Sequence, residues 1–490
     1  MLRWCLFGLL CCVGVFSSCA YRANIEGDDT KVPLPKETDL TKLPLPKDLS
    51  IPMVPKGSKD VNDTCKRRGA LIVCTLEGTY KGTQVLTSDR VWLLRGLVHV
   101  GEDKNFVTEP QIPELSGVLV IEPGTTIWGE KSSNGRLVIH GNSRIYAVGQ
   151  PKKPIVFTSS MEEGKRKAGD WGGLYLSGLA TISDCGSGQD TCQSISPQGF
   201  YGGPNDDDDS GLLQYVRIEF AGRPATEFSK HNGLVLQGVG RKTRVSHVQI
   251  HQSLQSGLTL LGGTVNWKYV LSTGVGRSHL YWRFGWRGKG QFFVAQSMAN
   301  NESIGINGQN NPGLLNEAPR SQPTLSNVTL LGGRSTKSKQ GVLLHQGTAG
   351  HLANMVAAGW SQSCVMLDQI ETLQHAWAQN NLSGTLTLSH SVFFCNKTTA
   401  EPELLGGETA PFSVKDFVER LNPGNSLKAP KFSKATEEGK EAWKPLPDSP
   451  LQGGAVWKGP HADDFFQKVS FVGAVGTEDW TKGWTTNRVR

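Results

Sequence analysis

Short apolar segments recur along the chain at a nearly constant spacing, and this pattern dominates the sequence. From about residue 115 to 300, such a segment begins roughly every 18–20 residues and ends at Gly, Pro or Ser. The pattern predicts a solenoid of short strands, because each repeat is too small to bury its apolar side chains without its neighbours. The clearest segments begin at Leu119, Leu137, Ile155, Leu174, Val216, Leu234, Val248, Leu258, Tyr269, Leu325, Val342 and Leu386.

We therefore expect an all-β fold, a right-handed single-stranded parallel β-helix. A sandwich or a propeller also contains many short strands, but neither explains loops of uneven length on a fixed repeat. Alternate residues of a strand point to opposite faces. Val216, Ile218 and Phe220 are thus expected inside the coil, and Arg217 and Glu219 outside it as an ion pair.

The open ends of such a coil must be covered, because unpaired strand edges invite aggregation. We expect the aromatic tail at 466–484 to act as one of these caps. The expected organisation is a signal peptide at 1–18, a tether at 19–60, an N-terminal cap with the first strands at 61–110, the β-helix at 111–400, and a C-terminal loop and capping segment at 401–490.

The N-terminus predicts export. Arg3 precedes an apolar stretch at 4–16 and two small residues, the order found in secretory signal peptides. Residues 16–20 (FSSCA) resemble a bacterial lipobox, which implies that Cys19 becomes the first mature residue and carries acyl chains. We therefore expect a lipid anchor in the outer membrane of a bacterial envelope, with the membrane as partner. The alternative is an ordinary secretory signal with an incidental cysteine.

The tether repeats a Pro-Leu-Pro-Lys motif at 33–36 and 44–47, and two further prolines follow. Proline at this density favours extended polyproline II, at ~3.1 Å per residue, so the segment is expected to act as a semi-rigid spacer.

Composition narrows the function. The chain has 490 residues and a formal charge of +7, and the charge is not gathered into a basic stripe, so nucleic acid is not an expected partner. Six of the ten cysteines lie beyond Cys19, and an even number in an exported protein indicates disulfides. Their spacing does not suit zinc. The expected pairs are Cys65 with Cys74, Cys185 with Cys192, and Cys364 with Cys395.

Several motifs together resemble a family of bacterial β-helix lipoproteins of the kind found in bacteroidetes and myxobacteria. The main match is 202–222 (GGPNDDDDSGLLQYVRIEFAG), and 121–126 (IEPGTT), 169–174 (GDWGGL) and 285–291 (GWRGKGQ) support it. The resemblance implies a pectate-lyase-like β-helix and no particular reaction. Relatives carry an acidic cluster before the last motif, whereas 277–284 (RSHLYWRF) holds no carboxylate here.

An acidic run is the candidate metal site. It consists of Asp206, Asp207, Asp208 and Asp209, and it offers the carboxylate oxygens that Ca²⁺ prefers. The other interpretation is a solvated turn whose carboxylates cap backbone N–H groups. Calcium is the one cofactor that the sequence suggests.

A second candidate is an aromatic and basic segment, which could stack sugar rings or hold an acidic polymer. The other interpretation places its tryptophans in the core with arginines lying over them, and we favour that one. The members of the segment are Tyr281, Trp282, Arg283, Trp286, Arg287 and Lys289.

No catalytic residues emerge from the pattern. A glycosidase needs two carboxylates ~5–9.5 Å apart, and Glu219 has no evident partner on the neighbouring strands. We therefore expect a non-catalytic envelope protein that binds polysaccharide or another envelope component. The alternative is a divergent polysaccharide lyase or glycoside hydrolase.

Overall fold

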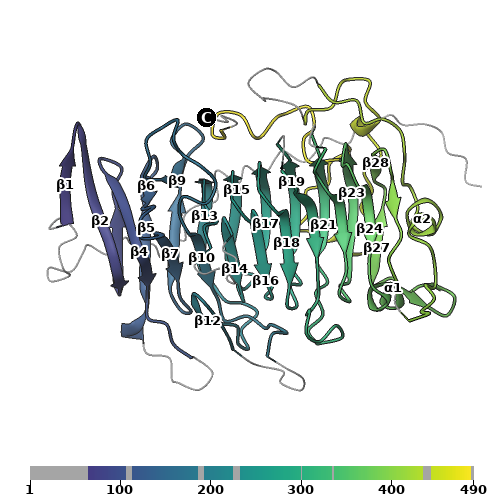
Figure 1. Ribbon diagram of the computed structural model, residues 1–490, viewed down its shortest axis with the longest axis horizontal. Coiled ribbons are helices and arrows are strands. Elements are labelled where there is room, and N and C mark those ends of the chain that lie inside the picture. Colours follow the sequence, from purple (N-terminus) through teal and green to yellow (C-terminus); the bar gives the residue numbers. More distant parts are fainter. Residues whose placement is uncertain are drawn as a thin grey trace, which may run out of the picture. The chain divides into compact units, whose positions relative to one another are not determined.

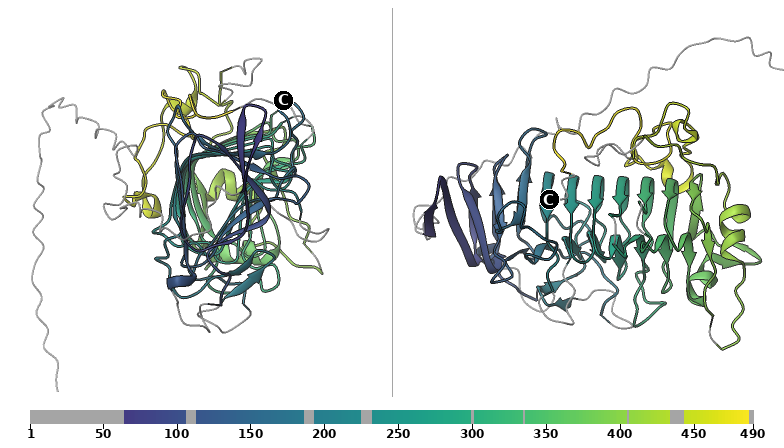
Figure 2. Two further views of the ribbon diagram at one scale, coloured as in Figure 1. Left: turned by 90° about the vertical axis from the view of Figure 1, so that its left-hand side faces the viewer. Right: turned by 45° about the horizontal axis from the view of Figure 1, so that its top comes forward.

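Parallel strands stack in three columns in the computed structural model of the chain (Figure 1). The structure describes residues 64–105, 113–185, 193–224, 232–298, 301–333, 336–404, 406–433 and 443–486, all within the unit Val54–Arg490. Of the described strands, 25 join one continuous sheet. Viewed from its N-terminal end, this sheet winds around a single interior (Figure 2). The predicted parallel β-helix is confirmed.

Column A supplies one wall of the coil. It consists of β7 (Arg136–Ile139), β10 (Gly173–Ser177), β14 (Leu234–Gln237), β16 (Leu258–Leu261), β18 (Ser278–Arg283), β20 (Ile304–Gly308), β22 (Gln340–Leu344), β24 (Ser363–Leu367) and β29 (Thr399–Ala400).

Columns B and C form the other two walls. In most coils one bent strand serves B with its first half and C with its second: β13 (Gly211–Glu219), β15 (Arg244–His251), β17 (Asn266–Thr273), β19 (Lys289–Gln296), β21 (Thr324–Leu331) and β23 (Gly350–Ala358). At the N-terminal side column B contains β3 (Gly82–Leu86), β5 (Gly117–Ile121) and β8 (Arg144–Val148), and column C contains β6 (Thr126–Gly129) and β9 (Ile155–Ser159). There β2 (Leu71–Tyr80) and β4 (Val91–Val100) run from C into A, and at the far end β27 (Leu386–Ser389) and β28 (Val392–Phe394) complete B and C.

The interior follows the two-residue alternation of the strands. Val216 and Ile218 are fully buried in the main core cluster, as predicted. Phe220 is also buried, but it is not a member of that cluster. Its φ of 60° turns the chain out of the strand, and its ring meets His251 edge-on. Arg217 and Glu219 form the predicted ion pair at 2.9 Å, with Glu219 buried against the wall.

A ladder of aromatic residues marks the corner between columns B and C. The corner ladder consists of Tyr215, His247, Tyr269 and Phe292, each with φ between 50° and 59°. One residue in this left-handed region bends each strand from B into C. Successive rings stack with centroids 4.4, 4.5 and 4.8 Å apart, close to the ~4.8 Å that separates neighbouring strands. Asn327 continues the same corner position in the next coil.

The C-terminal segment (residues 443–486) lies along this corner and over column C (yellow in Figures 1 and 2). Trp480 and Trp484 meet His247 edge-on, and Gln467 accepts a hydrogen bond of 2.8 Å from the Tyr269 hydroxyl. The segment contains the 3₁₀ turns η5 (Pro450–Gln452) and η6 (Gly459–Ala462). The tail at 466–484 therefore covers a side of the coil, and its predicted role as an end cap is wrong.

Helices close the C-terminal end of the coil instead. They are α1 (Ile370–Ala376), α2 (Val414–Asp416) and the π-helical turn η4 (Phe417–Leu421). Phe412 and Phe417 stack at 5.5 Å and extend the main core cluster. Antiparallel pairs and a 3₁₀ turn lie outside the columns: β11 (Ser194–Ser196) with β12 (Gly199–Tyr201), β25 (Trp377–Ala378) with β26 (Asn381–Leu382), and η3 (Pro113–Leu115).

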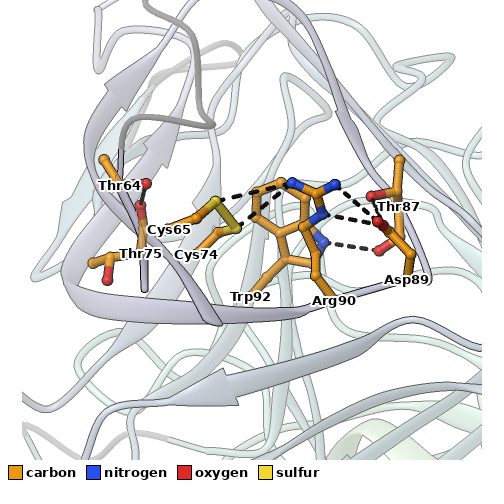
Figure 3. Close-up of a disulfide and its surroundings, with 8 residues drawn as sticks. All are labelled: Thr64, Cys65, Cys74, Thr75, Thr87, Asp89, Arg90 and Trp92. Atoms are coloured by element: carbon orange, nitrogen blue, oxygen red, sulfur yellow. Dashed lines mark hydrogen bonds and ion pairs between the residues drawn. A yellow bond between two sulfur atoms is a disulfide. The ribbon is translucent and has the colours of Figure 1, made fainter. Parts of the chain in front are cut away.

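The N-terminal end is closed by β1 (Cys65–Arg68), which pairs antiparallel with β2 (Figure 3). A disulfide joins Cys65 and Cys74, which lie opposite each other in that pair. The Arg90 guanidinium lies 3.9 Å from both sulfurs and 5.9 Å from the ring centroid of Trp92, and Asp89 holds it at 2.8 Å. Arg90 thus links the disulfide to Trp92 and Asp89 at this end of the coil.

The predicted disulfide between Cys364 and Cys395 is also confirmed. Cys192 lies outside the described residues, as do the predicted signal peptide, Cys19 and the whole predicted tether. Within the part of the chain that the structure describes, no helix has the length and apolar character needed to cross a membrane.

Candidate binding pocket

The acidic run occupies the turn between β12 and β13, and its four carboxylates take different partners. Three of them form ion pairs with cations of other segments at 3.0–3.7 Å: Asp206 with Arg287 and Arg241, Asp207 with Arg241 and Lys242, and Asp209 with Arg144. Among the described residues, no group of three or more His, Cys, Asp or Glu side chains could hold a metal ion. The structure thus does not bring the run together as a ligand set.

The fourth carboxylate is buried. Asp208 is 5% exposed and accepts hydrogen bonds from the Ser210 hydroxyl at 3.0 Å and the Gly240 amide at 3.3 Å. Burial raises its pKa to about 6, although these hydrogen bonds oppose the shift. The side chain fastens the acidic turn to the turn that follows β14, which is a structural role.

The aromatic and basic segment divides between the interior and the surface. Trp282 and Trp286 are fully buried and donate hydrogen bonds to Thr348 and to the Val265 carbonyl at 3.0 and 3.1 Å. A Cβ at Gly308 in the next coil would lie 2.3 Å from the Trp282 ring, so glycine makes room for it. The core interpretation is therefore correct for both tryptophans, and they offer no stacking surface.

The other members of the segment lie outside the coil. Tyr281 donates a hydrogen bond of 2.9 Å to Gln309 on the outer face of column A. The Arg283 guanidinium lies 4.0 Å from the ring centroid of Phe284. Arg287 follows in the turn to β19, where it pairs with Asp206 of the acidic run, and Lys289 is the first residue of β19.

These two residues help to form a surface pocket of about 240 Å³, which we call the cationic pocket. Its lining comes from three successive turns between columns A and B, together with one residue of the acidic run. The lining residues are Asp206, Arg241, Thr264, Asn266, Arg287 and Lys289. The two regions that the sequence presented as separate sites thus meet in one place.

Asp206 holds the pocket together. It accepts hydrogen bonds from the Thr181 amide and hydroxyl at 3.1 and 2.6 Å and from Arg287 at 3.0 Å. Burial alone would raise its pKa, but the hydrogen bonds from Thr181 and the charge of Arg287 together hold the pKa below its usual value. Asp206 is therefore a fixed anion and not a proton donor at neutral pH.

The cations of the pocket differ in how accessible they are. The Arg241 side chain is 52% exposed and pairs with Asp206 at 3.5 Å and Asp207 at 3.4 Å, while Arg287 is 26% exposed and pairs with Asp206 at 3.0 Å. Lys289 forms an ion pair of 2.5 Å with Asp463 of the C-terminal segment. Arg241 is thus the most exposed of the three cations and can reach a carboxylate or sulfate group, for which the planar guanidinium suits bidentate hydrogen bonding.

Sequence reasoning missed Arg241, Thr264 and Asn266. Each lies in or directly after a turn that follows a strand of column A, and these turns come one coil apart. The repeat itself was the available signal, because residues at equivalent positions of successive coils lie side by side.

Among the comparisons of the chain with known proteins, one gives a match. The family model described as the pectate-lyase-like β-helix domain matches residues 99–443, well over half of the chain. No curated protein and no solved structure matches the chain.

Proposed function

Because the chain belongs to the family of pectate-lyase-like β-helix domains, we propose that it is a lipid-anchored envelope protein that binds an acidic polysaccharide without cleaving it. The observation that carries this proposal is the cationic pocket. Arg241 projects from one turn, and Arg287 and Lys289 project from the equivalent turn two coils further on, so positive charge recurs along the coil axis. A polymer with an acid group on each unit offers a matching row of charges.

Binding is favoured over hydrolysis by the carboxylates. Asp206 is the only one among the described residues that line the pocket, and its hydrogen bonds keep it ionised. A glycosidase needs one carboxyl group that can donate a proton and a second ~5–9.5 Å away. Glu219 is buried against Arg217 and Thr158, at 2.9 and 3.0 Å, and so is not presented to a sugar.

Export and anchoring extend the proposal to the N-terminus. Two disulfides in the described residues favour an oxidising compartment, where such bonds persist. A signal peptide ending before Cys19 would deliver the protein there, and acyl chains on that cysteine would keep it at the membrane.

A pair of neighbouring variants tests the binding site. Arg241→Gln removes the exposed guanidinium of the pocket, and Lys242→Gln removes an equal charge from the next residue, which does not line it. The full chain is titrated with polygalacturonate, and with dextran as the uncharged polymer. Loss of a charge-assisted hydrogen bond costs about 1.5–3 kcal/mol, so we expect Arg241→Gln to weaken polygalacturonate binding about 10–100-fold and Lys242→Gln to change it little.

Three results would contradict the proposal: equal binding of dextran, equal effects of the two variants, or release of new reducing or unsaturated ends by the wild-type protein. The last would favour the hydrolase or lyase alternative. The anchor is tested separately by replacing Cys19 with Ser. The variant should leave the membrane fraction and lose palmitate labelling, whereas Cys12→Ser, within the signal peptide, should behave like wild type.

A further inference from the structure

A second and larger pocket lies at a different corner of the coil. It has a volume of about 530 Å³, within the range of pockets that hold small organic ligands. The turns that follow column C in three successive coils form it, together with the last residue of β1. Its lining residues are Arg68, Glu130, Lys131, Ser132, Ser160, Met161 and Arg223.

The charges of this pocket do not cancel. Lys131 forms an ion pair of 2.9 Å with Asp170, which is 2% exposed and also accepts a hydrogen bond of 2.7 Å from Ser159. Glu130 is likewise offset by Arg95 at 3.3 Å. Because each of these pairs is neutral, the net charge of the pocket is positive and comes from Arg68 and Arg223.

Arg68 and Arg223 have no carboxylate partner among the described residues. Arg223 is half-buried, and its guanidinium donates a hydrogen bond to the Lys131 carbonyl, which positions it at the pocket wall. Arg68 is exposed at the end of β1. Two unpaired guanidinium groups at one pocket are the arrangement that binds anionic groups with several oxygens.

The remaining lining residues indicate which kind of ligand the pocket can hold. The Ser160 hydroxyl accepts a hydrogen bond of 3.2 Å from the Lys131 amide and keeps its own proton for donation. Ser132 adds a second hydroxyl, and Met161 supplies an apolar wall. The pocket is much larger than an inorganic anion, so it has room for an organic group beside the charged one.

From the two positive charges, the hydroxyl groups and the apolar wall we propose that the second pocket binds a phosphate monoester of sugar size. A phosphate monoester carries close to two negative charges at neutral pH, which match the two unpaired guanidinium groups. The serine hydroxyls donate to further phosphate oxygens, and the sugar lies toward Met161. This site is independent of the cationic pocket, which lies between columns A and B.

Glucose 6-phosphate serves as the probe, with glucose and inorganic phosphate as the two partial ligands. Calorimetric titration of the full chain should give saturable binding of glucose 6-phosphate, weaker binding of phosphate and none of glucose. We expect Arg223→Gln and Arg68→Gln each to weaken binding at least tenfold. Arg241→Gln, which alters only the cationic pocket, should leave the affinity within twofold.

Arg68→Gln guards against misfolding, because Arg68 lies at the surface and thermal melting of this variant should match wild type. The proposal is overturned by absence of saturable binding, by unchanged affinity in Arg68→Gln and Arg223→Gln, or by loss of binding in Arg241→Gln. Equal affinity for inorganic phosphate and glucose 6-phosphate would reduce the site to an anion site and refute the sugar-sized ligand. None of these results depends on whether polygalacturonate binds.

Discussion

Replacing Asp208 with Asn should stabilise the protein at neutral pH, which is unusual for a fully buried polar residue. The carboxylate is 5% exposed and has no cation among the partners that the structure gives it. An Asn oxygen can accept the same hydrogen bonds from Ser210 and Gly240. The substitution therefore removes a buried negative charge and keeps the contacts that fasten the turn.

The pKa sets the size and the sign of the effect. The folded protein binds the Asp208 proton with a pKa of about 6, against an ordinary value of 3.8. Between these values the folded state holds more protons than the unfolded state, so this carboxyl makes the wild type less stable as pH rises from about 4 to 6. The gap corresponds to about 3 kcal/mol at pH 7.5 and about 1 kcal/mol at pH 4.5.

Urea denaturation followed by tryptophan fluorescence at these two pH values measures the difference. Asp208→Asn should unfold at a higher urea concentration than wild type at pH 7.5, and the gain should shrink at pH 4.5. Asp207→Asn is the matched control, since its carboxylate is 53% exposed and should change stability by less than about 1 kcal/mol. A destabilised Asp208→Asn protein at pH 7.5, or an equal gain at both pH values, would refute the reasoning.

Four further predictions follow from the core, the corner ladder, the cap and the acidic run. Trp282→Ala should lower the free energy of unfolding by about 3–5 kcal/mol, and Tyr281→Ala on the outer face by much less, in urea titrations. Burial lowers the pKa of His247 to about 4, so this residue destabilises the fold as pH falls from 6.5 to 4; His247→Phe should remove up to about 3 kcal/mol of that loss in melts across this range. Replacing Cys65 and Cys74 together by Ala should lower the unfolding free energy by about 2–3 kcal/mol. Calorimetric titration with Ca²⁺ should give no saturable heat, because ion pairs occupy the acidic run; saturable binding would support the calcium interpretation instead.

The coil could be predicted from the sequence because its repeat can be followed along the chain without knowing which strands pair. Each apolar segment returns at a similar spacing, and the alternation within it places Val216 and Ile218 inside. The corners could not be predicted in the same way. Phe220 and Tyr269 look like strand residues, yet both have φ near +60°, a conformation that local sequence does not dictate for an aromatic residue.

The C-terminal tail shows a different limit of prediction from the sequence. Its aromatic residues indicate that 466–484 packs against an apolar surface, but they do not say which surface. An open end and an aromatic corner ladder both offer one. The tail packs its rings edge-on against the ladder and also supplies Gln467 for the Tyr269 hydroxyl, so the side of the coil is covered.

The pocket was missed for a related reason. Asp206 and Arg287 lie 81 residues apart, and each was assigned to its own site because sequence patterns record neighbours along the chain. The buried position of Trp282, which the core interpretation predicted, agrees with the alternation of the strand, since Leu280 two residues earlier is also a core residue. The ion pair between Asp206 and Arg287 could be predicted only from the register of the coils, which decides which turns lie side by side.

The geometry of the coil also limits how the cationic pocket can bind. Successive strands lie ~4.8 Å apart, so cations at equivalent turns repel one another unless anions lie between them. Here those anions come from outside the repeat, from Asp206 in the acidic turn and from Asp463 in the C-terminal segment. An acidic polymer that enters the pocket must compete with these two carboxylates for Arg287 and Lys289. Binding there should consequently be modest in affinity and should weaken steeply with salt, since the exposed charges that attract the polymer are the ones that ions screen.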